Sequence, residues 1–286
     1  MKLRLGRVDY LNCLPVYYAF AKKLVSAGCP LRIIKGVPTA LNQMFFEGKL
    51  DVTPLSSIEY ARHSRECLIL PNISISADGR VGSILLFSRI PVTELEGCRI
   101  ALTSSSSTSA DLLHILFEHY YHVNAAFSVQ QPDLDTMLRG AEAALLIGDD
   151  ALIAHHRVLD EGLPIRVTDL GEVWKDFTGE KMVYALWVVR KEFADRFPGE
   201  TNALSEAITA AKVEGMDHLS EIIRSARRRT RLPGSVLEEY FDLIRHDFDT
   251  GYQRALLLYY DYAYKSGLIE DRVQSLSIYP EKLYGD

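Results

Sequence analysis

A run of hydroxyl side chains occupies one strand-to-helix connection of this sequence, which we call a corner. Residues 102–113 read LTSSSSTSADLL, and every residue from Thr103 to Ser109 is a serine or a threonine. An apolar strand-like segment precedes the run and an apolar helix-like segment follows it. The first amide groups of a helix, together with hydroxyl groups, can hold a carboxylate or a phosphate. A flexible loop that binds no ligand is the alternative interpretation. Features elsewhere in the sequence distinguish the two interpretations.

Small polar residues recur where other strands are expected to end. Asn12 follows the first expected strand, Ser56 and Ser57 follow the third, and Gly148 and Asp149 follow a later one. Ligands of parallel α/β sheets bind beyond the carboxyl ends of the strands. Corners of this kind in both halves of the chain predict two anion-binding rims that face each other. Ordinary helix capping without a ligand is the alternative at each corner.

The elements that position these corners alternate between strand and helix patterns. Hydrophobic periodicity and helix-start signals, including the capping box Ser-x-x-Glu at 56–59, define them. Strands are expected at 3–8, 31–35, 51–53, 68–70, 81–87, 99–102, 125–129, 143–147 and 183–189. Helices are expected at 16–26, 39–48, from 56, at 109–120, at 134–140, from Asp149 or Asp150, and repeatedly after Glu192, with a loop around Trp174.

Repeated strand–helix units predict parallel sheets with right-handed crossovers. Two series of such units predict two lobes, with residues 1–88 and 190–286 in the first lobe and 89–189 in the second. The chain would cross between the lobes near 81–87 and near 183–189. Two crossings predict a hinge and a ligand cleft between the lobes.

Composition limits the classes of function. The chain has 286 residues, 48% of them hydrophobic and 24% charged, which is typical of a globular protein. Its formal charge of −6 argues against nucleic acid as a partner, and the basic run at 227–231 is expected to be a solvated helix end. We find no secretory signal pattern and no apolar stretch long enough to span a membrane, and we therefore expect a cytoplasmic protein.

Cysteine and histidine patterns predict neither a metal site nor disulfides. The four cysteines lack the CxxC spacing of zinc sites, and we expect them to be reduced thiols. They are Cys13, Cys29, Cys67 and Cys98. The histidines are scattered, and no HExxH motif is present.

Several blocks of the chain resemble, in order, the chorismate dehydratases of the futalosine route to menaquinone. They are GRVDYLNCLPVYY (6–18), DVTPLSSIEYAR (51–62), SISADGRVGSILLFS (74–88), ALTSSSSTSADLL (101–113), ALLIGDDAL (144–152), WKDFTG (174–179) and YALWVVR (184–190). The resemblance covers most of residues 6–190 and is weaker in the helical tail. It implies an α/β, two-lobed, periplasmic-binding-protein-like (type II) fold with mixed, mainly parallel sheets and an interlobe cleft.

The resemblance also implies the chemistry. Chorismate would lose water to give 3-[(1-carboxyvinyl)oxy]benzoate, without metal or cofactor, because fixed donors in a dry cleft suffice for this reaction. Asn12 and Ser83 are assigned the catalytic roles at the reacting face and the leaving hydroxyl. The two carboxylates of the substrate would be bound by two groups of residues. The first group is Ser56 and Ser57, and the second is Ser107, Thr108 and Ser109, with Gly148 and Asp149 nearby.

Two hypotheses remain for the group that accepts the proton lost from the substrate. Asp149 and Asp150 are the obvious carboxylates, but helix capping and interaction with the helix dipole explain both. If they are caps, the enolpyruvyl carboxylate of the substrate itself is close enough to take the proton. Arg7 and Arg80 could pair with a substrate carboxylate, although solvation at the surface is the simpler expectation for both.

Two other functions stay open. The sister family, the 1,4-dihydroxy-6-naphthoate synthases of the same pathway, shares the fold and the serine corners but carries a catalytic histidine where this chain has LIGDD around Gly148. That departure favours the dehydratase. A cytosolic protein that only binds small carboxylates is the non-enzyme alternative, because fold alone does not determine function. The helical tail is expected to pack on the first lobe, and a homodimer through its tyrosines is the alternative.

Overall fold

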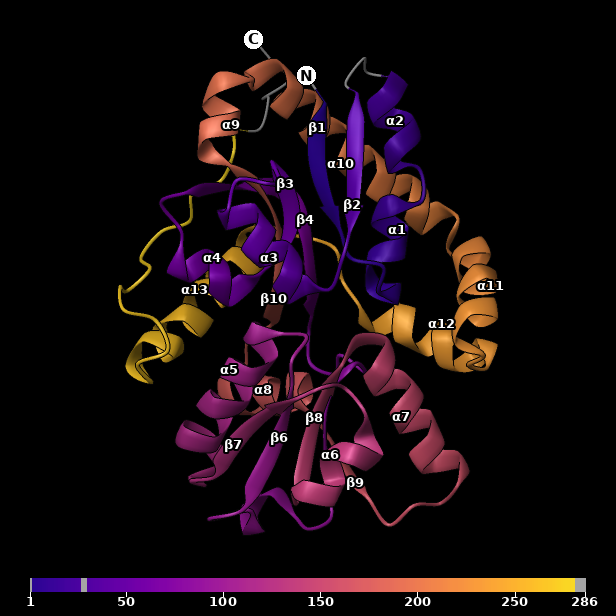
Figure 1. The fold of residues 1–286 in the computed structure, drawn as a ribbon, viewed down its shortest axis with the longest axis vertical. Coiled ribbons are helices and arrows are strands. Elements are labelled where there is room, and N and C mark those ends of the chain that lie inside the picture. The colour runs from indigo at the N-terminus through magenta and orange to yellow at the C-terminus, as the bar shows by residue number, and fades with distance from the viewer. Residues whose placement is uncertain (1, 27–29, 281–286) are drawn as a thin grey trace.

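The computed structural model describes residues 2–26 and 30–280, and within them ten strands form two five-stranded sheets (Figure 1). The first sheet has the order β2-β1-β3-β10-β4. Its strands are β1 (Leu3–Arg7), β2 (Leu31–Lys35), β3 (Val52–Ser56), β4 (Cys67–Ala77) and β10 (Met182–Arg190). β1 pairs in parallel with β2 and β3, whereas β10 lies antiparallel between β3 and β4.

The second sheet repeats this arrangement with the order β7-β6-β8-β5-β9. Its strands are β5 (Ile84–Ser88), β6 (Arg99–Thr103), β7 (Ala126–Gln130), β8 (Ala143–Ile147) and β9 (Arg166–Asp169). β6 pairs in parallel with β7 and β8, and β5 lies antiparallel to β8 and β9. The prediction of α/β sheets with parallel cores is therefore confirmed, and each sheet contains one antiparallel strand that the chain contributes after crossing over.

Each of the two crossing strands belongs to a different sheet from the one expected. β5 was placed in the first lobe, but Ile84 pairs with Ile147 in the second sheet. β10 was placed in the second lobe, but Ala185 pairs with Ser56 in the first sheet. Both strands are almost entirely buried and apolar, so that their residue pattern carries no sign of which sheet they join. A division that follows the sheets therefore changes lobe before β5 and before β10.

Thirteen α-helices surround the sheets in the described residues. They are α1 (Leu14–Tyr17), α2 (Phe20–Ser26), α3 (Pro38–Phe46), α4 (Ser57–Arg62), α5 (Ser107–Leu116), α6 (Leu134–Gly140), α7 (Gly148–Asp160), α8 (Leu170–Thr178), α9 (Lys191–Arg196), α10 (Pro198–Asp217), α11 (Leu219–Thr230), α12 (Gly234–Leu243) and α13 (Thr250–Lys265). Short turns occur as 3₁₀ helices at η1 (Leu11–Cys13) and η2 (Val92–Glu94), and as a π-helical turn at η3 (Phe117–Tyr121).

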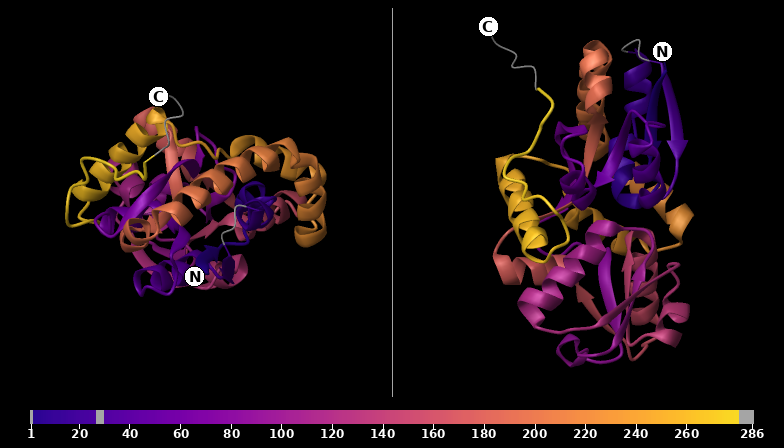
Figure 2. Two further views of the ribbon diagram at one scale, coloured as in Figure 1. Left: turned by 90° about the horizontal axis from the view of Figure 1, so that it is seen from above. Right: turned by 60° about the vertical axis from the view of Figure 1, so that its left-hand side comes forward.

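The helical tail does more than pack on the first lobe. α10 runs along the first lobe, while α11 and α12 reach one side of the waist and α13 reaches the other (Figures 1 and 2). The segment after α13 returns to the first sheet, where Ile278 bridges to Ile69. Tyr259 and Arg229 bond Thr108 of α5 and Asp149 of α7, so that the tail contacts both lobes and brings residues that follow position 218 to the junction between them.

Two local expectations differ from the structure. The helix expected at 16–26 is split into α1 and α2, and the loop expected around Trp174 contains β9 and α8. Cys13, Cys67 and Cys98 are free thiols, whereas Cys29 lies outside the described residues. No helix in the described part of the chain is both long enough and apolar enough to cross a membrane.

Candidate functional site

A cavity lies at the junction of the two sheets. It encloses about 610 Å³ of space between the atoms, including the solvent at its mouth. Residues from both lobes line it: Val8, Tyr10, Asn12, Cys13, Pro38, Pro54, Ser56, Ile75, Val81, Ser83, Ile84, Ser106, Ser109, Ile147, Gly148, Tyr184 and Ala185. Five of the nine residues assigned to the site from sequence are in this lining. They are Asn12, Ser56, Ser83, Ser109 and Gly148.

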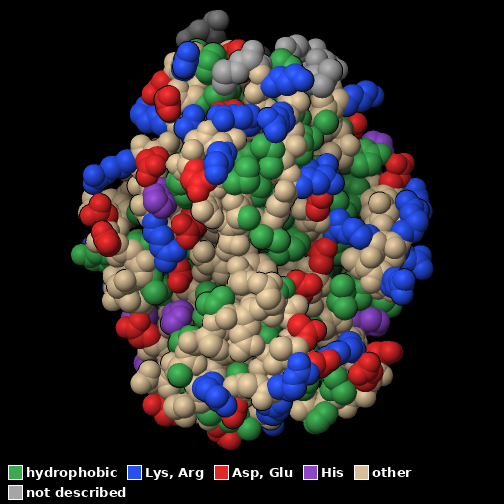
Figure 3. Space-filling model, in the orientation of Figure 1, with side chains coloured by type: hydrophobic (Ala, Val, Ile, Leu, Met, Phe, Trp, Pro, Cys, Tyr) green, Lys and Arg blue, Asp and Glu red, His purple; other side chains and the backbone are tan. Residues whose placement is uncertain are grey.

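All side chains in this lining are uncharged at neutral pH. Its titratable groups are two tyrosines and a cysteine, and burial raises the pKa of each of them. The pKa of Tyr10 rises to about 12, and those of Cys13 and Tyr184 also lie far above neutrality. Charged side chains are also sparse at the centre of the face shown in Figure 3, where backbone, uncharged polar and apolar atoms dominate. The cavity therefore offers neutral donors and apolar walls.

Asn12 lies in the turn η1, and three hydrogen bonds fix the backbone of this turn. Cys13 N donates to Tyr10 O (3.1 Å), and Leu11 N donates to Asp149 Oδ1 (2.9 Å). Nε2 of His246 lies 2.7 Å from Asn12 O. Because burial lowers the pKa of His246 to about 4, the imidazole is neutral at pH 7 and donates this bond from Nε2.

Asp149 has a different role from the two that the sequence suggested. It is absent from the cavity lining, and it makes no capping bond to the start of α7. Its carboxylate accepts from Leu11 N of the first lobe and from Nη2 of Arg229 on α11 (2.6 Å). The carboxylate of Asp149 therefore fixes the turn that contains Asn12. Arg229, which was expected to be solvated, in turn fixes the carboxylate of Asp149. Asp150 is half-buried and is also absent from the lining.

Ser83 precedes β5 at the point where the chain crosses between the sheets. It is 2% exposed, and its carbonyl accepts from Gly148 N (2.7 Å). The turn before it is held by Asp169, whose carboxylate accepts from Val81 N and from Gly82 N (2.7 Å). The sequence analysis did not identify Asp169, because its partners lie about 87 residues earlier in the chain.

Gly148 begins α7 beside the ring of Tyr10. Its φ is +58°, which L side chains rarely adopt, and a Cβ there would lie 3.3 Å from the ring of Tyr10. A side chain at this position would be strained and would press on Tyr10. Glycine is therefore strongly favoured at this end of β8, where Tyr10 and α7 approach each other closely.

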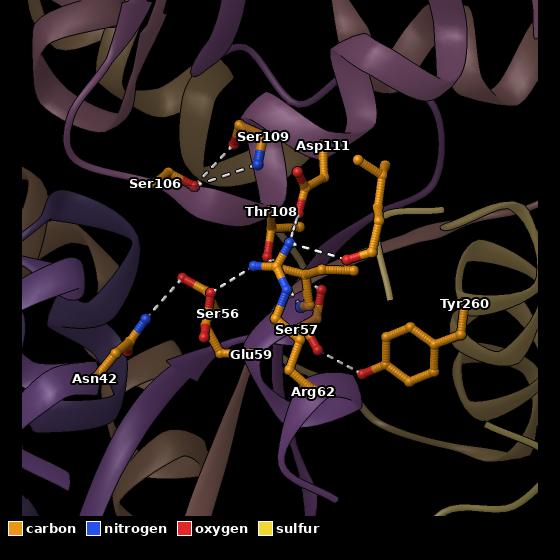
Figure 4. A network of polar contacts seen from close by, with 12 residues as sticks. Asn42, Ser56, Ser57, Glu59, Arg62, Ser106, Thr108, Ser109, Asp111 and Tyr260 are labelled. Carbon is orange, nitrogen blue, oxygen red and sulfur yellow. Dashed lines mark hydrogen bonds and ion pairs between the residues drawn. The ribbon is translucent and has the colours of Figure 1, made fainter. Parts of the chain in front are cut away.

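The two expected anion-binding rims touch each other on one side of the waist (Figure 4). Ser57 Oγ lies 3.4 Å from Thr108 Oγ1 and donates to Val183 O (2.8 Å), and Ile58 N donates to Thr108 Oγ1 (3.2 Å). Ser57 and Thr108 are 0% and 1% exposed, and neither lines the cavity. The structure therefore does not bring these two hydroxyls to the cavity, because they join the starts of α4 and α5.

The expected capping box at the start of α4 does not form. Ser56 makes no capping bond, and its hydroxyl instead accepts from Asn42 Nδ2 (3.4 Å). Thr108 of the other lobe provides the hydroxyl that accepts from the first turn of α4. Ser56 is thereby free to line the cavity.

α13 and an ion pair strengthen this contact between the lobes (Figure 4). The hydroxyl of Tyr260 donates to Ser57 O (2.7 Å), and that of Tyr259 donates to Thr108 O (3.3 Å). Arg62 of α4 pairs with Asp111 of α5 (2.9 Å). One helix of the tail therefore binds the first turns of two helices that belong to different lobes.

The serine corner reaches the cavity through Ser106 and Ser109. Ser106 Oγ accepts from Ser109 N (3.3 Å), as the N-cap of α5, and donates to Ser109 Oγ (3.1 Å). Ser107 is half-buried and is not in the lining. Sequence analysis missed Ser106, although its N-cap position was a readable signal.

Other residues considered from sequence lie away from the cavity. Arg7 pairs with Asp9 (2.7 Å) and Arg80 with Glu239 (3.3 Å), and neither arginine is in the lining. Over the described ranges, no three His, Cys, Asp or Glu side chains are grouped as metal ligands would be.

Comparison with known proteins gives both a family and curated relatives. Residues 3–265 match the model of a family described as menaquinone biosynthesis. The chain is 28% identical over 256 residues to the chorismate dehydratase of Thermus thermophilus, covering 86% of this chain and 89% of that protein. It is 27% identical over 221 residues to the 1,4-dihydroxy-6-naphthoate synthase of the same organism, covering 77% of each.

Solved structures show the same fold. A protein from Archaeoglobus fulgidus superimposes with a TM-score of 0.75 at 18% identity, over 94% of this chain and 98% of that one. The periplasmic aliphatic sulphonate binding protein SsuA from Escherichia coli superimposes with a TM-score of 0.68 at 13% identity, over 100% of this chain and 94% of that one. The predicted periplasmic-binding-protein-like fold is confirmed.

Proposed function

The chain belongs to the menaquinone biosynthesis family, and from that premise we propose that it is a chorismate dehydratase that forms 3-[(1-carboxyvinyl)oxy]benzoate. The observation that carries the proposal is the uncharged cavity between the lobes, with an amide and several hydroxyls in its lining. Dehydration of chorismate needs an oriented substrate, hydrogen-bond donors and the exclusion of water. It does not need a strong protein base, because formation of the aromatic product ring favours the reaction. The relative named chorismate dehydratase supports the same assignment.

The reaction breaks two bonds to ring carbons of the substrate, the C3–H bond and the C4–O bond. The C3 proton leaves, and its electron pair delocalises through the C1=C2 double bond toward the ring carboxylate. The pair then returns to expel the C4 hydroxyl, which departs as water by taking up the proton released at C3. Asn12 and Ser83 donate to the reacting face and to the leaving hydroxyl, while Ser56, Ser106 and Ser109 bind the carboxylates. An oxyanion donor of this kind lowers a barrier by about 2.7–4 kcal/mol.

The proton acceptor in this proposal is the enolpyruvyl carboxylate of the substrate. Among the described residues, no carboxylate side chain is in the cavity lining. Asp149, the strongest protein candidate, already accepts from Leu11 N and Arg229. The substrate carboxylate is tethered near C3, and such proximity contributes as much as ~7–11 kcal/mol in favourable cases.

The sister activity, 1,4-dihydroxy-6-naphthoate synthase, is the second candidate, and a relative with that name covers 77% of this chain. The resemblance places a catalytic histidine of that family at the strand end that Gly148 occupies here. No histidine is in the described lining of the cavity, and the φ of +58° at Gly148 is one that L side chains rarely adopt. These observations favour the dehydratase.

Incubation of the purified protein with chorismate tests the proposal. We expect the benzoate product by ultraviolet absorbance and mass spectrometry, and no conversion of cyclic dehypoxanthine futalosine, the substrate of the sister family. Ser83→Ala is expected to lower turnover by about 100-fold or more. Ser88→Ala is the matched control, because Ser88 ends β5, the strand that Ser83 precedes, is 0% exposed and does not line the cavity.

Two results would contradict the proposal in different ways. Conversion of the futalosine derivative alone would identify the sister enzyme. Chorismate that binds but returns unchanged from well-folded protein would identify a carboxylate-binding protein without catalysis.

A further inference from the structure

A bulge in β10 brings one more polar side chain to the cavity. Val183 of β10 pairs with Ser76 of β4. The next pair joins Ala185 to Ile75, so that β10 advances by two residues while β4 advances by one. Tyr184 is therefore the extra residue of a β-bulge. Bulges change the direction of a side chain, and they are frequent beside active sites.

The bulge explains why two consecutive residues of one strand line the cavity. Side chains of a regular strand alternate between the two faces of the sheet. Ala185 pairs with Ser56 and with Ile75, and all three residues line the cavity, which identifies the face of the first sheet that the cavity contacts. In a regular strand Tyr184 would point to the opposite face, but it also lines the cavity. The extra residue thus turns the tyrosine toward the cavity.

The hydroxyl of Tyr184 is a buried donor. The residue is 6% exposed, and its hydroxyl has no hydrogen-bond partner among the described residues. Burial raises the pKa of this hydroxyl far above neutrality, so that it retains its hydrogen at pH 7. Nearly all buried polar groups form a hydrogen bond, and a buried donor in a cavity lining that forms none requires an explanation.

The packing at Gly171 shows where this hydroxyl lies. Gly171 is in the first turn of α8, and its backbone is not in the left-handed region that favours glycine. A Cβ at this position would lie 2.6 Å from the hydroxyl oxygen of Tyr184 and closer still to Gly79 O. Gly79 precedes the turn that leads to Ser83. The hydroxyl of a first-lobe residue therefore lies where α8 of the second lobe meets the crossing segment.

We propose that Tyr184 is a further substrate-binding residue, whose hydroxyl donates a hydrogen bond to a carboxylate oxygen of the bound substrate. This inference rests on the proposed function, because it adds one group to those that bind chorismate. The described lining contains no cationic side chain, so that both carboxylates depend on neutral donors. One of these donors is already engaged, since Ser106 donates to Ser109 Oγ (3.1 Å). Tyr184 transfers no proton in this role.

Tyr184→Phe tests the proposal because it removes only the hydroxyl. Loss of one charge-assisted bond corresponds to about 10- to 100-fold, and we expect kcat/KM for chorismate and the affinity for the benzoate product to fall by this factor. Tyr17→Phe is the matched control. Tyr17 is also buried and its hydroxyl also lacks a partner, but it does not line the cavity. The control should stay within about twofold of the wild type.

Thermal unfolding without ligand separates a binding role from a structural one. The hydroxyl of Tyr184 has no hydrogen bond to lose, so that Tyr184→Phe should unfold at the same temperature as the wild type or at a higher one. A loss of affinity that is accompanied by a lower unfolding temperature would identify a structural hydroxyl and would overturn the inference.

This inference and the proposed function fail in different ways. If the wild type converts chorismate and Tyr184→Phe retains both kcat/KM and affinity, only the inference is wrong. If the wild type binds chorismate without converting it, the dehydratase assignment is wrong, and a loss of affinity of about 10- to 100-fold in Tyr184→Phe still supports the binding role. If the wild type neither converts nor binds chorismate, both are wrong.

Discussion

Replacing Thr108 with valine is expected to lower stability and to leave ligand affinity unchanged, whereas replacing its neighbour Ser109 with alanine is expected to weaken binding. The two residues carry similar hydroxyls, but Thr108 joins α5 to Ile58 N of the other lobe and Ser109 lines the cavity. The pair of variants therefore separates a structural hydroxyl from a binding hydroxyl in the same serine-rich turn.

The structure gives the size of each effect. Valine at position 108 keeps the shape but removes the acceptor of Ile58 N, whose residue is 0% exposed. A buried N–H group that loses its partner costs about 1–3 kcal/mol, while Ser57 retains its bond to Val183 O. At position 109, loss of one charge-assisted bond of about 1.5–3 kcal/mol corresponds to about 10- to 100-fold weaker binding.

Urea unfolding and calorimetric titration with chorismate measure the two quantities. For Thr108→Val we expect a lower midpoint with an unchanged slope m, because the surface exposed on unfolding is the same. Its affinity should stay within about twofold of the wild type, since each 1.4 kcal/mol corresponds to tenfold. Weaker binding of Thr108→Val with unchanged stability would refute the reasoning, because the hydroxyl would then be a ligand group and the contact between the lobes would not persist in solution.

Three further substitutions test other parts of the site. Gly148→Ala is expected to destabilise the protein by about 1–2 kcal/mol through the strained φ and to weaken binding by displacing Tyr10, as measured by thermal unfolding and titration. Asp149→Asn should lower kcat by about tenfold, because the charge-assisted bond from Leu11 N becomes a neutral one, and unchanged steady-state rates would count against it. Burial raises the pKa of Asp111 to about 6 from 3.8, so that the native state binds this proton more tightly and loses stability as pH rises from about 4 to 6. Relative to Asp111→Asn, the wild type should lose no more than about 3 kcal/mol over that range in unfolding experiments, and a constant difference would contradict the shift.

The strands and several helices could be predicted because their signals are local. The strand at 31–35, the helix at 134–140 and the strand at 143–147 have the predicted ends. β9 and α8 were missed because β9 has only four residues, with no strong alternation, and α8 follows it directly. The sheet that accepts a fully buried strand depends on pairing with distant residues, and for this reason the crossing strands were placed in the wrong lobe.

The site was predictable only at the small polar residues next to strand ends. Asn12, Ser56, Ser83, Ser109 and Gly148 line the cavity, as small polar residues at strand ends should. Contacts between distant segments determine the rest. The capping signal at 56–59 is strong locally, but a hydroxyl from the other lobe provides the bond instead. The replacement of a local capping group by a distant one cannot be recognised without the tertiary structure.

The tail supplies residues to the site that no spacing could have indicated. Arg229 pairs with Asp149, and His246 bonds Asn12 O, each from more than 75 residues away along the chain. Neither lies in a block that carries the family resemblance, which is weakest in this segment. Both contact the turn without lining the cavity, so that chemical character alone could not distinguish them from other tail residues.

Contacts on both sides of the waist hold the two lobes together. On the α4–α5 side, Ile58 N, Tyr259 and Tyr260 each make a buried bond to the start of α4 or α5, and bonds of this kind contribute about 0.5–1.5 kcal/mol each. On the opposite side, Leu11 N donates a charge-assisted bond of about 1.5–3 kcal/mol to Asp149, and the partly exposed ion pair between Arg229 and Asp149 adds at most about 1 kcal/mol. The two sides therefore contribute similar free energies, and separation of the lobes on either side breaks bonds of comparable strength. Because Asp149 accepts both bonds on its side, parting of the lobes there also releases the turn that contains Asn12.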